Sequence, residues 1–147
     1  MDEIDRRIVR ALETDGRIRN TELAKTVGLS PSACLRRVSD LERRGVIAGY
    51  RAVIDPKARG IGFIAYVAVG LSDHSKRAQT AFEESISRAG EVRECHNITG
   101  SVEYLLRVET RDLEDYKRFH LNVLGTIEHV TAITSYIVMA SPKDARR

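Results

Sequence analysis

The chain has few cysteines, no tryptophan and no long hydrophobic run, and each shortage excludes a class of protein. Cys34 and Cys95 are the only cysteines among 147 residues, which excludes a disulfide framework and a cysteine-based zinc spacing. We expect both to be buried small hydrophobes in a reducing compartment. The longest uncharged apolar run, residues 60–72, is too short to cross a bilayer as a helix. Because the sequence is charged from Asp2 onward, we expect no signal peptide and a cytoplasmic location.

The sequence also lacks recognisable catalytic machinery. The four histidines lie at positions 74, 96, 120 and 129, and none pairs with another at a metal-ligand spacing. No nucleophile can be matched to an acid or base from chain order alone. We therefore predict a protein that is not an enzyme and that holds no metal and no cofactor.

The charge that is present is mildly basic and unevenly placed. The formal net charge is +3, and residues 1–60 carry 13 lysines and arginines against 9 acidic residues, a surplus of four. The remainder carries one net negative charge. A positive surplus confined to one half of a chain is typical of a module that faces phosphates.

Residues 20–47 have the pattern of a complete helix-turn-helix, preceded by a third helix with apolar residues at helical spacing. We expect Asn20 to cap a short helix over residues 20–27, and Gly28 to supply the positive φ of a tight turn. Ser30 and Pro31 then open a second helix with a capping hydroxyl and a proline at the first helical position. A short polar and arginine-bearing face backed by an apolar one is what a major-groove reader needs.

The second helix is predicted to bury Leu35, Val38 and Leu41 and to expose Ser32, Ala33 and Arg36. Arg36 either reads guanine edges in the major groove or pairs with Asp40 four residues on. The alternative for the whole segment is an ordinary amphipathic helix pair with a solvated arginine face. We predict that the residues that contact duplex DNA are Asn20, Thr21, Ser30, Ser32, Ala33, Arg36, Arg37 and Arg43, with Arg37, Arg43 and Arg44 suited to phosphates.

The second half of the chain changes period and predicts a different fold. A short strand is expected over residues 51–54 and turn chemistry follows it. Strands over 61–71, 92–98, 102–109 and 130–139 alternate with helices over 75–89 and 112–124, the second with Leu113, Tyr116 and Phe119 facing in. The order βαββαβ is ferredoxin-like. The fold class is therefore α+β, with a winged helix-turn-helix domain over 1–48, a linker strand and hinge over 49–60, and a ferredoxin-like domain over 61–147.

The patterning of this predicted sheet indicates self-association. Both helices should cover one face, yet the first strand is apolar on both sides, and the last strand carries Tyr136 and Val138 opposite Ile133 and Ile137. An uncovered apolar face implies a partner surface. A two-fold dimer is the simplest solution, and it would present two helix-turn-helix units to two DNA half-sites.

The chain closely resembles the Lrp/AsnC family of transcription regulators over nearly its whole length. The segments that carry the resemblance in the first half are IDRRI (4–8), DGRI (15–18), LSPSACLRRV (29–38) and LERRGVI (41–47). Those in the second half are ECH (94–96), TG (99–100), EYLL (103–106) and YIVM (136–139).

The resemblance implies a sequence-specific regulator with a sensor domain that binds an amino acid or related metabolite. It also implies dimers through the sensor sheets, often assembled as a tetramer of dimers (an octamer). The family's pattern commonly has an acidic residue after the glycine and an aspartate before the tyrosine, where this chain has Ser101 and Glu103. The effector residues that the resemblance implies are Asn97, Thr99, Gly100, Ser101, Glu103, Tyr104, Thr134 and Ser135.

The residues themselves leave some of these roles open. A glycine turn can expose backbone amides to a carboxylate. Glu103 either holds an effector amine or is a solvent-facing strand residue opposite Arg107 on the same face. Two rival functions also remain: an amino-acid-binding sensor or enzyme with no role on DNA, and a DNA-architectural protein without an effector.

Overall fold

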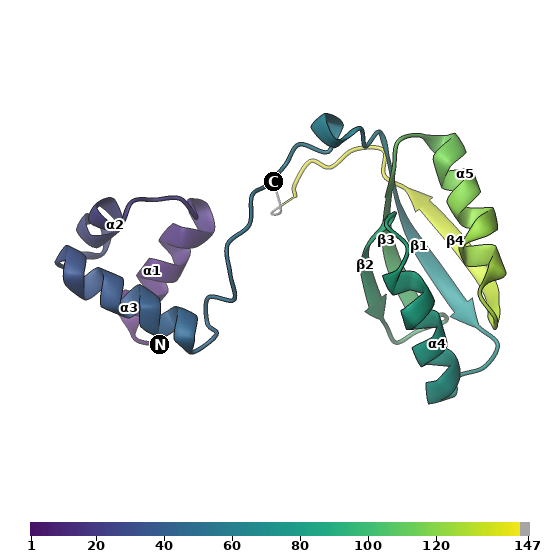
Figure 1. The fold of residues 1–147 in the computed structure, drawn as a ribbon, viewed down its shortest axis with the longest axis horizontal. Helices are drawn as coiled ribbons and strands as arrows, with labels where there is room; N and C mark the ends of the chain where they lie inside the picture. Colours follow the sequence, from purple (N-terminus) through teal and green to yellow (C-terminus); the bar gives the residue numbers. More distant parts are fainter. Residues whose placement is uncertain (145–147) are drawn as a thin grey trace. The chain divides into compact units, whose positions relative to one another are not determined.

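Three helices form the first of the two units into which the computed structural model divides, residues 1–52, and the second unit begins at Val53. The structure describes residues 1–144. In Figure 1 the first unit comprises α1 (Glu3–Thr14), α2 (Asn20–Val27) and α3 (Pro31–Arg43). Its core is made of Ile8, Leu23, Ala24, Val27, Cys34 and Leu41, all buried.

The turn between α2 and α3 has the predicted geometry. Gly28 adopts φ 75° and its N–H bonds back to α2, a left-handed conformation that glycine adopts without a Cβ penalty. Leu29 is half-buried against the core of this unit. The predicted cap of α2 is wrong by one residue, because Arg19 is the N-cap and makes no side-chain cap bond. Asn20 is instead the first helical residue.

Val38 and Leu41 lie on the inward face of α3 as predicted, but the third position on that face is Cys34 and not Leu35. Cys34 and Leu41 are fully buried and Val38 is half-buried, whereas Leu35 is 57% exposed. Positions 34, 38 and 41 follow the i, i+4, i+7 spacing of a single helix face, and position 35 lies about 100° away from 34. Leu35 therefore shares the outer surface of α3 with Arg36.

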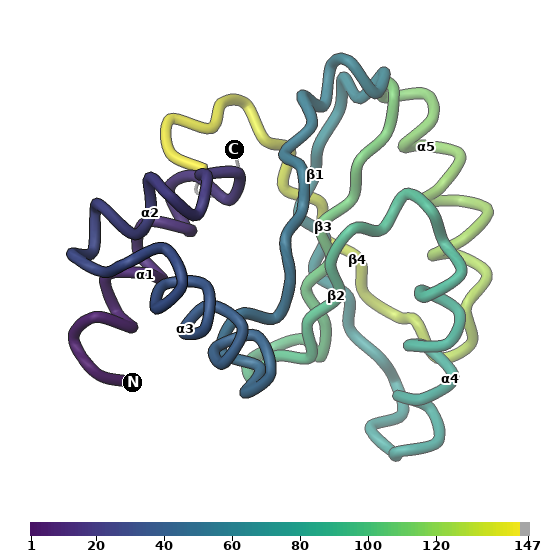
Figure 2. Tube along the Cα trace, turned by 60° about the vertical axis from the view of Figure 1, so that its left-hand side comes forward, coloured from purple at the N-terminus to yellow at the C-terminus, as the bar shows by residue number. Residues whose placement is uncertain are grey.

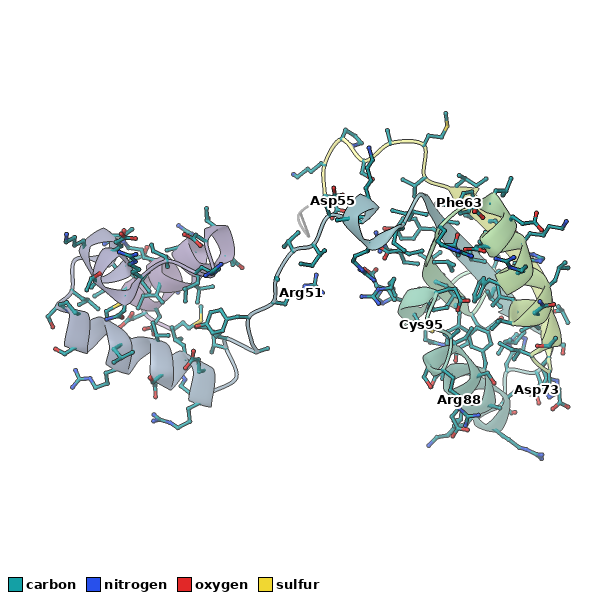
Figure 3. The ribbon with its side chains drawn as sticks, turned by 45° about the horizontal axis from the view of Figure 1, so that its top comes forward. Arg51, Asp55, Phe63, Asp73, Arg88 and Cys95 are labelled. Atoms are coloured by element: carbon teal, nitrogen blue, oxygen red, sulfur yellow. The ribbon has the colours of Figure 1, made fainter. Side chains whose placement is uncertain are left out.

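The predicted wing is absent from the part of the chain that the structure describes, because no strand precedes Phe63. The short strand expected over residues 51–54 is wrong for the same reason. Arg51 lies on an extended segment (Figure 3), and Val53 and Ile54 are 56% and 53% exposed. Their β-branched sequence favours an extended backbone, but a strand also requires a hydrogen-bonded neighbour.

The second unit has the predicted βαββαβ order. Its regular elements are β1 (Phe63–Leu71), α4 (Lys76–Ser87), β2 (Val92–Asn97), β3 (Tyr104–Thr110), α5 (Leu113–Asn122) and β4 (Val130–Ile137), with short 3₁₀ turns at Lys57–Arg59 and Leu124–Thr126. The sheet order is β2-β3-β1-β4, antiparallel throughout. The two central strands, β1 and β3, are the most deeply buried, and β2 and β4 form the edges.

Both helices of this unit cover one face of the sheet (Figure 2). Alternate residues of β1 and β3 pack under them, and the Phe82 and Tyr104 rings meet at a centroid distance of 4.4 Å. The buried residues of this core are Ala65, Val67, Val69, Leu71, Phe82, Ile86, Tyr104, Leu106, Val108, Tyr116, Phe119 and Leu124.

The opposite face of the sheet, which we call the open face, is apolar on β1 and β4. Tyr66 pairs with Tyr136 and Ala68 with Thr134 across these strands, and Tyr136 is 59% exposed. On β3 the same face carries Arg107 and Glu109, a buried ion pair. Within the described residues, Arg107 Nε and Glu109 Oε2 are buried without a hydrogen-bond partner.

Two side chains of the second unit lie on the surface against expectation. Leu113, predicted to face in, is 61% exposed because Asp112 caps α5 and the inward spacing begins at Tyr116. Cys95, predicted to be buried, is exposed on the edge strand β2 (Figure 3). The other cysteine, Cys34, is buried as expected, and burial raises the pKa of its thiol.

Candidate DNA-binding and effector sites

The start of α3 is exposed and locally well defined. Ser30 caps the helix by accepting a hydrogen bond from the Ala33 N–H at 3.3 Å, and its hydroxyl also meets that of Ser32 at 3.3 Å. Asn20 Nδ2 donates to the Pro31 carbonyl at 2.8 Å, which joins the start of α2 to the start of α3. Small polar side chains at this end permit a close approach to a groove.

Arg36 extends from the same exposed surface of α3. The intrahelical pair with Asp40 that the sequence allows is not formed in residues 1–144. Asp40 is instead occupied by Arg43 and by Arg44, the latter at 3.1 Å. The guanidinium of Arg36 therefore keeps its donors, whereas Arg43 and Arg44 share an acidic neighbour that weakens them as phosphate ligands.

Arg37, one residue further on, has a different environment. Its Nη1 donates to Asp2 Oδ2 at 2.5 Å and to Asp5 Oδ1 at 2.8 Å, both at the beginning of α1. The hydrogen bond from Arg37 is the main cause that lowers the pKa of Asp5, and it also contributes to the lowered pKa of Asp2. No local pattern in the sequence indicates this contact between helices. The one available signal is that position 37 lies on the same helix face as positions 34 and 41.

In the second unit, the predicted effector loop lies between β2 and β3. Thr99, Gly100 and Ser101 are exposed, and Gly100 adopts φ 144°, a conformation that L side chains rarely adopt. The Ile98 N–H donates to the Glu103 carbonyl at 2.8 Å and closes the loop. A glycine turn of this kind is suited to presenting backbone amides to an anion.

Glu103 is already bound within the protein. Its Oε2 accepts from the Leu71 N–H at 2.6 Å, and its Oε1 lies 3.0 Å from Nδ1 of His74. The alternative, a solvent-facing Glu103 opposite Arg107, is wrong, because the Glu103 side chain is only 18% exposed and Arg107 pairs with Glu109. The register of β1 and β3 ends at Val69 and Tyr104, so the Glu103 carboxylate replaces the strand carbonyl that Leu71 would otherwise meet.

The remaining predicted effector residues lie on both faces of the sheet. Tyr104 is fully buried under α4, where its hydroxyl donates to Glu83 Oε1 at 2.8 Å. Burial, followed by the bond to Glu83, raises the pKa of Tyr104 to about 12. Ser135 meets the Tyr116 hydroxyl of α5, whereas Thr134 shares the open face with Ala68. Asn97 pairs with Tyr104 at the end of β2.

The chemistry of Glu103 predicts a measurable effect on stability. We expect Glu103→Ala to lower the free energy of unfolding of the second unit by about 1–3 kcal/mol, because the N–H of buried Leu71 loses its acceptor. Glu103→Gln is the control, since its amide oxygen can still accept from Leu71. Urea denaturation measures the free energy of unfolding of both variants and of the wild type. Equal losses in both would show that the charge on Glu103, rather than the Leu71 bond, stabilises the loop.

The described residues contain neither a candidate metal site nor a candidate membrane span. No group of three His, Cys, Asp or Glu side chains within residues 1–144 could hold a metal ion. His74, His96 and His129 each lie near a carboxylate, at 3.0, 3.5 and 3.5 Å, and His120 packs against the Tyr116 ring. Over the same residues, no helix is both long and apolar enough to cross a membrane.

Two domain models of one protein family match this chain. Residues 1–42 match the AsnC-type helix-turn-helix domain, and residues 64–147 match the Lrp/AsnC ligand binding domain. The chain belongs to the Lrp/AsnC family. One chain thus carries the helix-turn-helix domain followed by the ligand binding domain of this family. This order confirms the resemblance on which the predicted function rests.

Individual relatives of this Lrp/AsnC protein cover almost the whole chain. It is 37% identical to the proline dehydrogenase transcriptional activator of Rhizobium radiobacter, over 98% of this chain and 92% of that protein. It is 35% identical to the leucine-responsive regulatory protein of Escherichia coli (strain K12), over 100% of this chain and 90% of that protein. These relatives are named as regulators of transcription, not as enzymes.

Solved structures of the family give the same result. A transcriptional regulator of Neisseria meningitidis, solved as a complex with L-Met, has a TM-score of 0.93 at 33% identity and covers 98% of this chain and 93% of its own. An AsnC family regulator of Agrobacterium tumefaciens has a TM-score of 0.92 at 34% identity, and the match covers 98% of this chain and 94% of that one. This Lrp/AsnC protein is thus a DNA-binding transcriptional regulator with a ligand binding domain, and the rival enzyme function is excluded.

Proposed function

We propose that this Lrp/AsnC protein binds duplex DNA through the exposed start of α3 and that an amino acid alters this binding. The observation that carries the proposal is the combination of a capped, exposed helix start with an arginine, Arg36, that Asp40 does not neutralise. The residues assigned to DNA are Asn20, Thr21, Ser30, Ser32, Ala33, Arg36 and Arg43. We also retain the cytoplasmic location as part of the proposal.

The effector is proposed to bind at the loop between β2 and β3. The exposed glycine turn at Gly100 is suited to binding the carboxylate of an amino acid through backbone amides, and Thr99 and Ser101 supply hydroxyls on the same loop. Since both oxygens of Glu103 are engaged inside the protein, we infer that Glu103 holds the loop in place. Methionine is the first candidate effector, because a related regulator was solved with it.

A thermal-shift screen of the twenty amino acids tests the effector. A ligand that binds only the native state stabilises it by about 2.7 kcal/mol at a hundredfold excess over its Kd, and the melting temperature rises accordingly. Calorimetric titration of the Glu103→Ala and Glu103→Gln variants with the amino acid found in the screen then tests whether Glu103 is needed for effector binding. If no amino acid binds at millimolar concentration, the second unit is an assembly module without an effector.

The assembly is proposed to be a dimer through the open face. Tyr66, Ala68 and Tyr136 form an apolar area on β1 and β4 that no helix of this unit covers. Arg107 Nε, which is buried without a hydrogen-bond partner among the described residues, lies on the same face and can be completed by a second copy. Glu109 Oε2 also makes no hydrogen bond there, although Arg59 Nη1 and Arg93 Nε each lie 3.7 Å from it. Such dimers can assemble further into the octamer that the family resemblance implies.

A further inference from the structure

The ion pairs of Arg37 are part of a closed network that joins α3 to the first turn of α1. Asp2 and Asp5 form a capping box at the start of α1. Asp2 Oδ1 accepts from the Asp5 N–H at 2.8 Å, and Asp5 Oδ2 accepts from the Asp2 N–H at 3.1 Å. The two remaining carboxylate oxygens accept from Arg37. Each of the four oxygens therefore has a hydrogen-bond donor.

The charge balance of this network is unfavourable for a phosphate contact. One guanidinium meets two carboxylates, so the group carries a net negative charge where a phosphate ligand must be positive. The Asp5 side chain is only 10% exposed and that of Arg37 is 34% exposed. Releasing Arg37 to a phosphate would leave a nearly buried carboxylate without its partner.

The position of Arg37 on α3 suits a role in holding the helix. Arg37 lies on the same side of α3 as the buried residues Cys34 and Leu41, three and four positions away. Arg36 lies about 100° around the helix and faces solvent. One side of α3 thus contacts the supporting helices while the neighbouring side is free for DNA.

We propose that Arg37 is a positioning residue for the DNA-reading helix and not a phosphate ligand. By fastening α3 to the capping box of α1, it fixes the direction in which Ser30, Ser32 and Arg36 face the groove. The proposal rests on the DNA-binding surface proposed above. It replaces the phosphate contact that the sequence predicts for Arg37.

The sharpest test removes an acidic residue. Charge alone predicts that Asp5→Asn tightens DNA binding, because a negative charge leaves the DNA-binding unit. Positioning predicts the reverse: we expect affinity for the preferred duplex to fall about tenfold, comparable to losing one base contact. The matched control is Glu3→Gln, which removes the same charge from the same turn of α1. Glu3 is exposed and pairs with Arg6.

The measurement is fluorescence anisotropy of the full chain on a duplex that the wild type selects from a randomised pool, with a scrambled duplex beside it. It is made at several salt concentrations, and circular dichroism verifies that each variant is folded at the assay temperature. We expect Arg37→Ala to lower affinity for the selected duplex while the slope of log K against log salt stays unchanged. A phosphate ligand would instead reduce the slope by about 0.9.

Arg37→Lys keeps the positive charge, and it replaces Arg37→Ala in the assay if Arg37→Ala does not fold. We expect it also to weaken binding to the selected duplex, because a compact ammonium on a shorter side chain does not reproduce the reach and planar geometry of the guanidinium between Asp2 and Asp5. The proposal is overturned if Asp5→Asn binds as tightly as Glu3→Gln or more tightly, or if Arg37→Lys binds like the wild type. Binding of the wild type to the selected duplex, measured in the same assay, tests the proposed DNA-binding function by itself. A failure of that function can therefore be distinguished from a failure of the role proposed for Arg37.

Discussion

Tyr136→Asp is expected to convert the protein from a dimer to a monomer at micromolar concentration. Tyr136 is 59% exposed on the open face and pairs with Tyr66 across β1 and β4. In the proposed dimer the new carboxylate would be buried without a partner, at a cost of about 3–5 kcal/mol. Association should then weaken by at least about a hundredfold. Analytical ultracentrifugation measures this directly, since one chain has a mass of 16.5 kDa.

Leu113→Asp is the matched control for the dimer. Leu113 is 61% exposed, so the same carboxylate replaces an apolar side chain of nearly equal exposure, but on α5 and away from the open face. We expect this variant to remain a dimer. A wild type that sediments as a stable 16.5 kDa monomer would contradict the dimer, as would a Tyr136→Asp variant that stays dimeric.

Arg36→Ala is expected to weaken specific DNA binding by roughly 1–3 kcal/mol, because its guanidinium can meet a guanine edge with two donors. The loss should be larger on the selected duplex than on a scrambled one if the contact is to a base. A phosphate contact would weaken both alike and reduce the salt slope by about 0.9. Anisotropy titrations on both duplexes separate these outcomes.

Arg6→Ala is the control for Arg36. It removes the same charge from the same unit, and Arg6 pairs with Glu3 on the exposed side of α1. We expect its effect to be small and equal on both duplexes. If Arg36→Ala and Arg6→Ala behave alike, Arg36 is not a groove-reading residue and the assigned surface of α3 is wrong.

Local sequence signals predicted the helix-turn-helix well because they act over a few residues. The Gly28 turn and the Ser30 cap depend on the conformational freedom of glycine and on one hydroxyl, and both are found in the structure. Val38 and Leu41 were predicted correctly, but Leu35 was placed on the inward face of α3 in place of Cys34, because it is the more hydrophobic of the two. The contacts with α1 and α2, which the sequence does not display, determine the actual face.

Long-range contacts explain the other differences. Residues 51–54 have strand-forming side chains but no neighbouring strand among residues 1–144, so propensity alone predicted wrongly. The pairing of Glu103 with Leu71 and His74 joins two segments of the chain that are far apart in sequence. The same holds for Arg37 and Asp5, which lie 32 residues apart.

One feature of the sensor domain could have been predicted from the sequence. Tyr104 has the same parity as Leu106 and Val108 along β3, so strand alternation places it with the apolar set under the helices. Its place in the effector set came from the family resemblance and not from this pattern. The loop over residues 99–101 is the exposed part of that set that lies outside the sheet.

The most direct test is footprinting of the wild-type protein on its selected duplex, with and without the amino acid identified by the thermal-shift screen. A DNA-binding regulator with an effector should protect regularly spaced half-sites, about 10–10.5 base pairs or a multiple apart. The amino acid should change either the affinity or the pattern of protection. Continuous protection without preferred half-sites, unchanged by any amino acid, would contradict this function and favour a DNA-architectural protein.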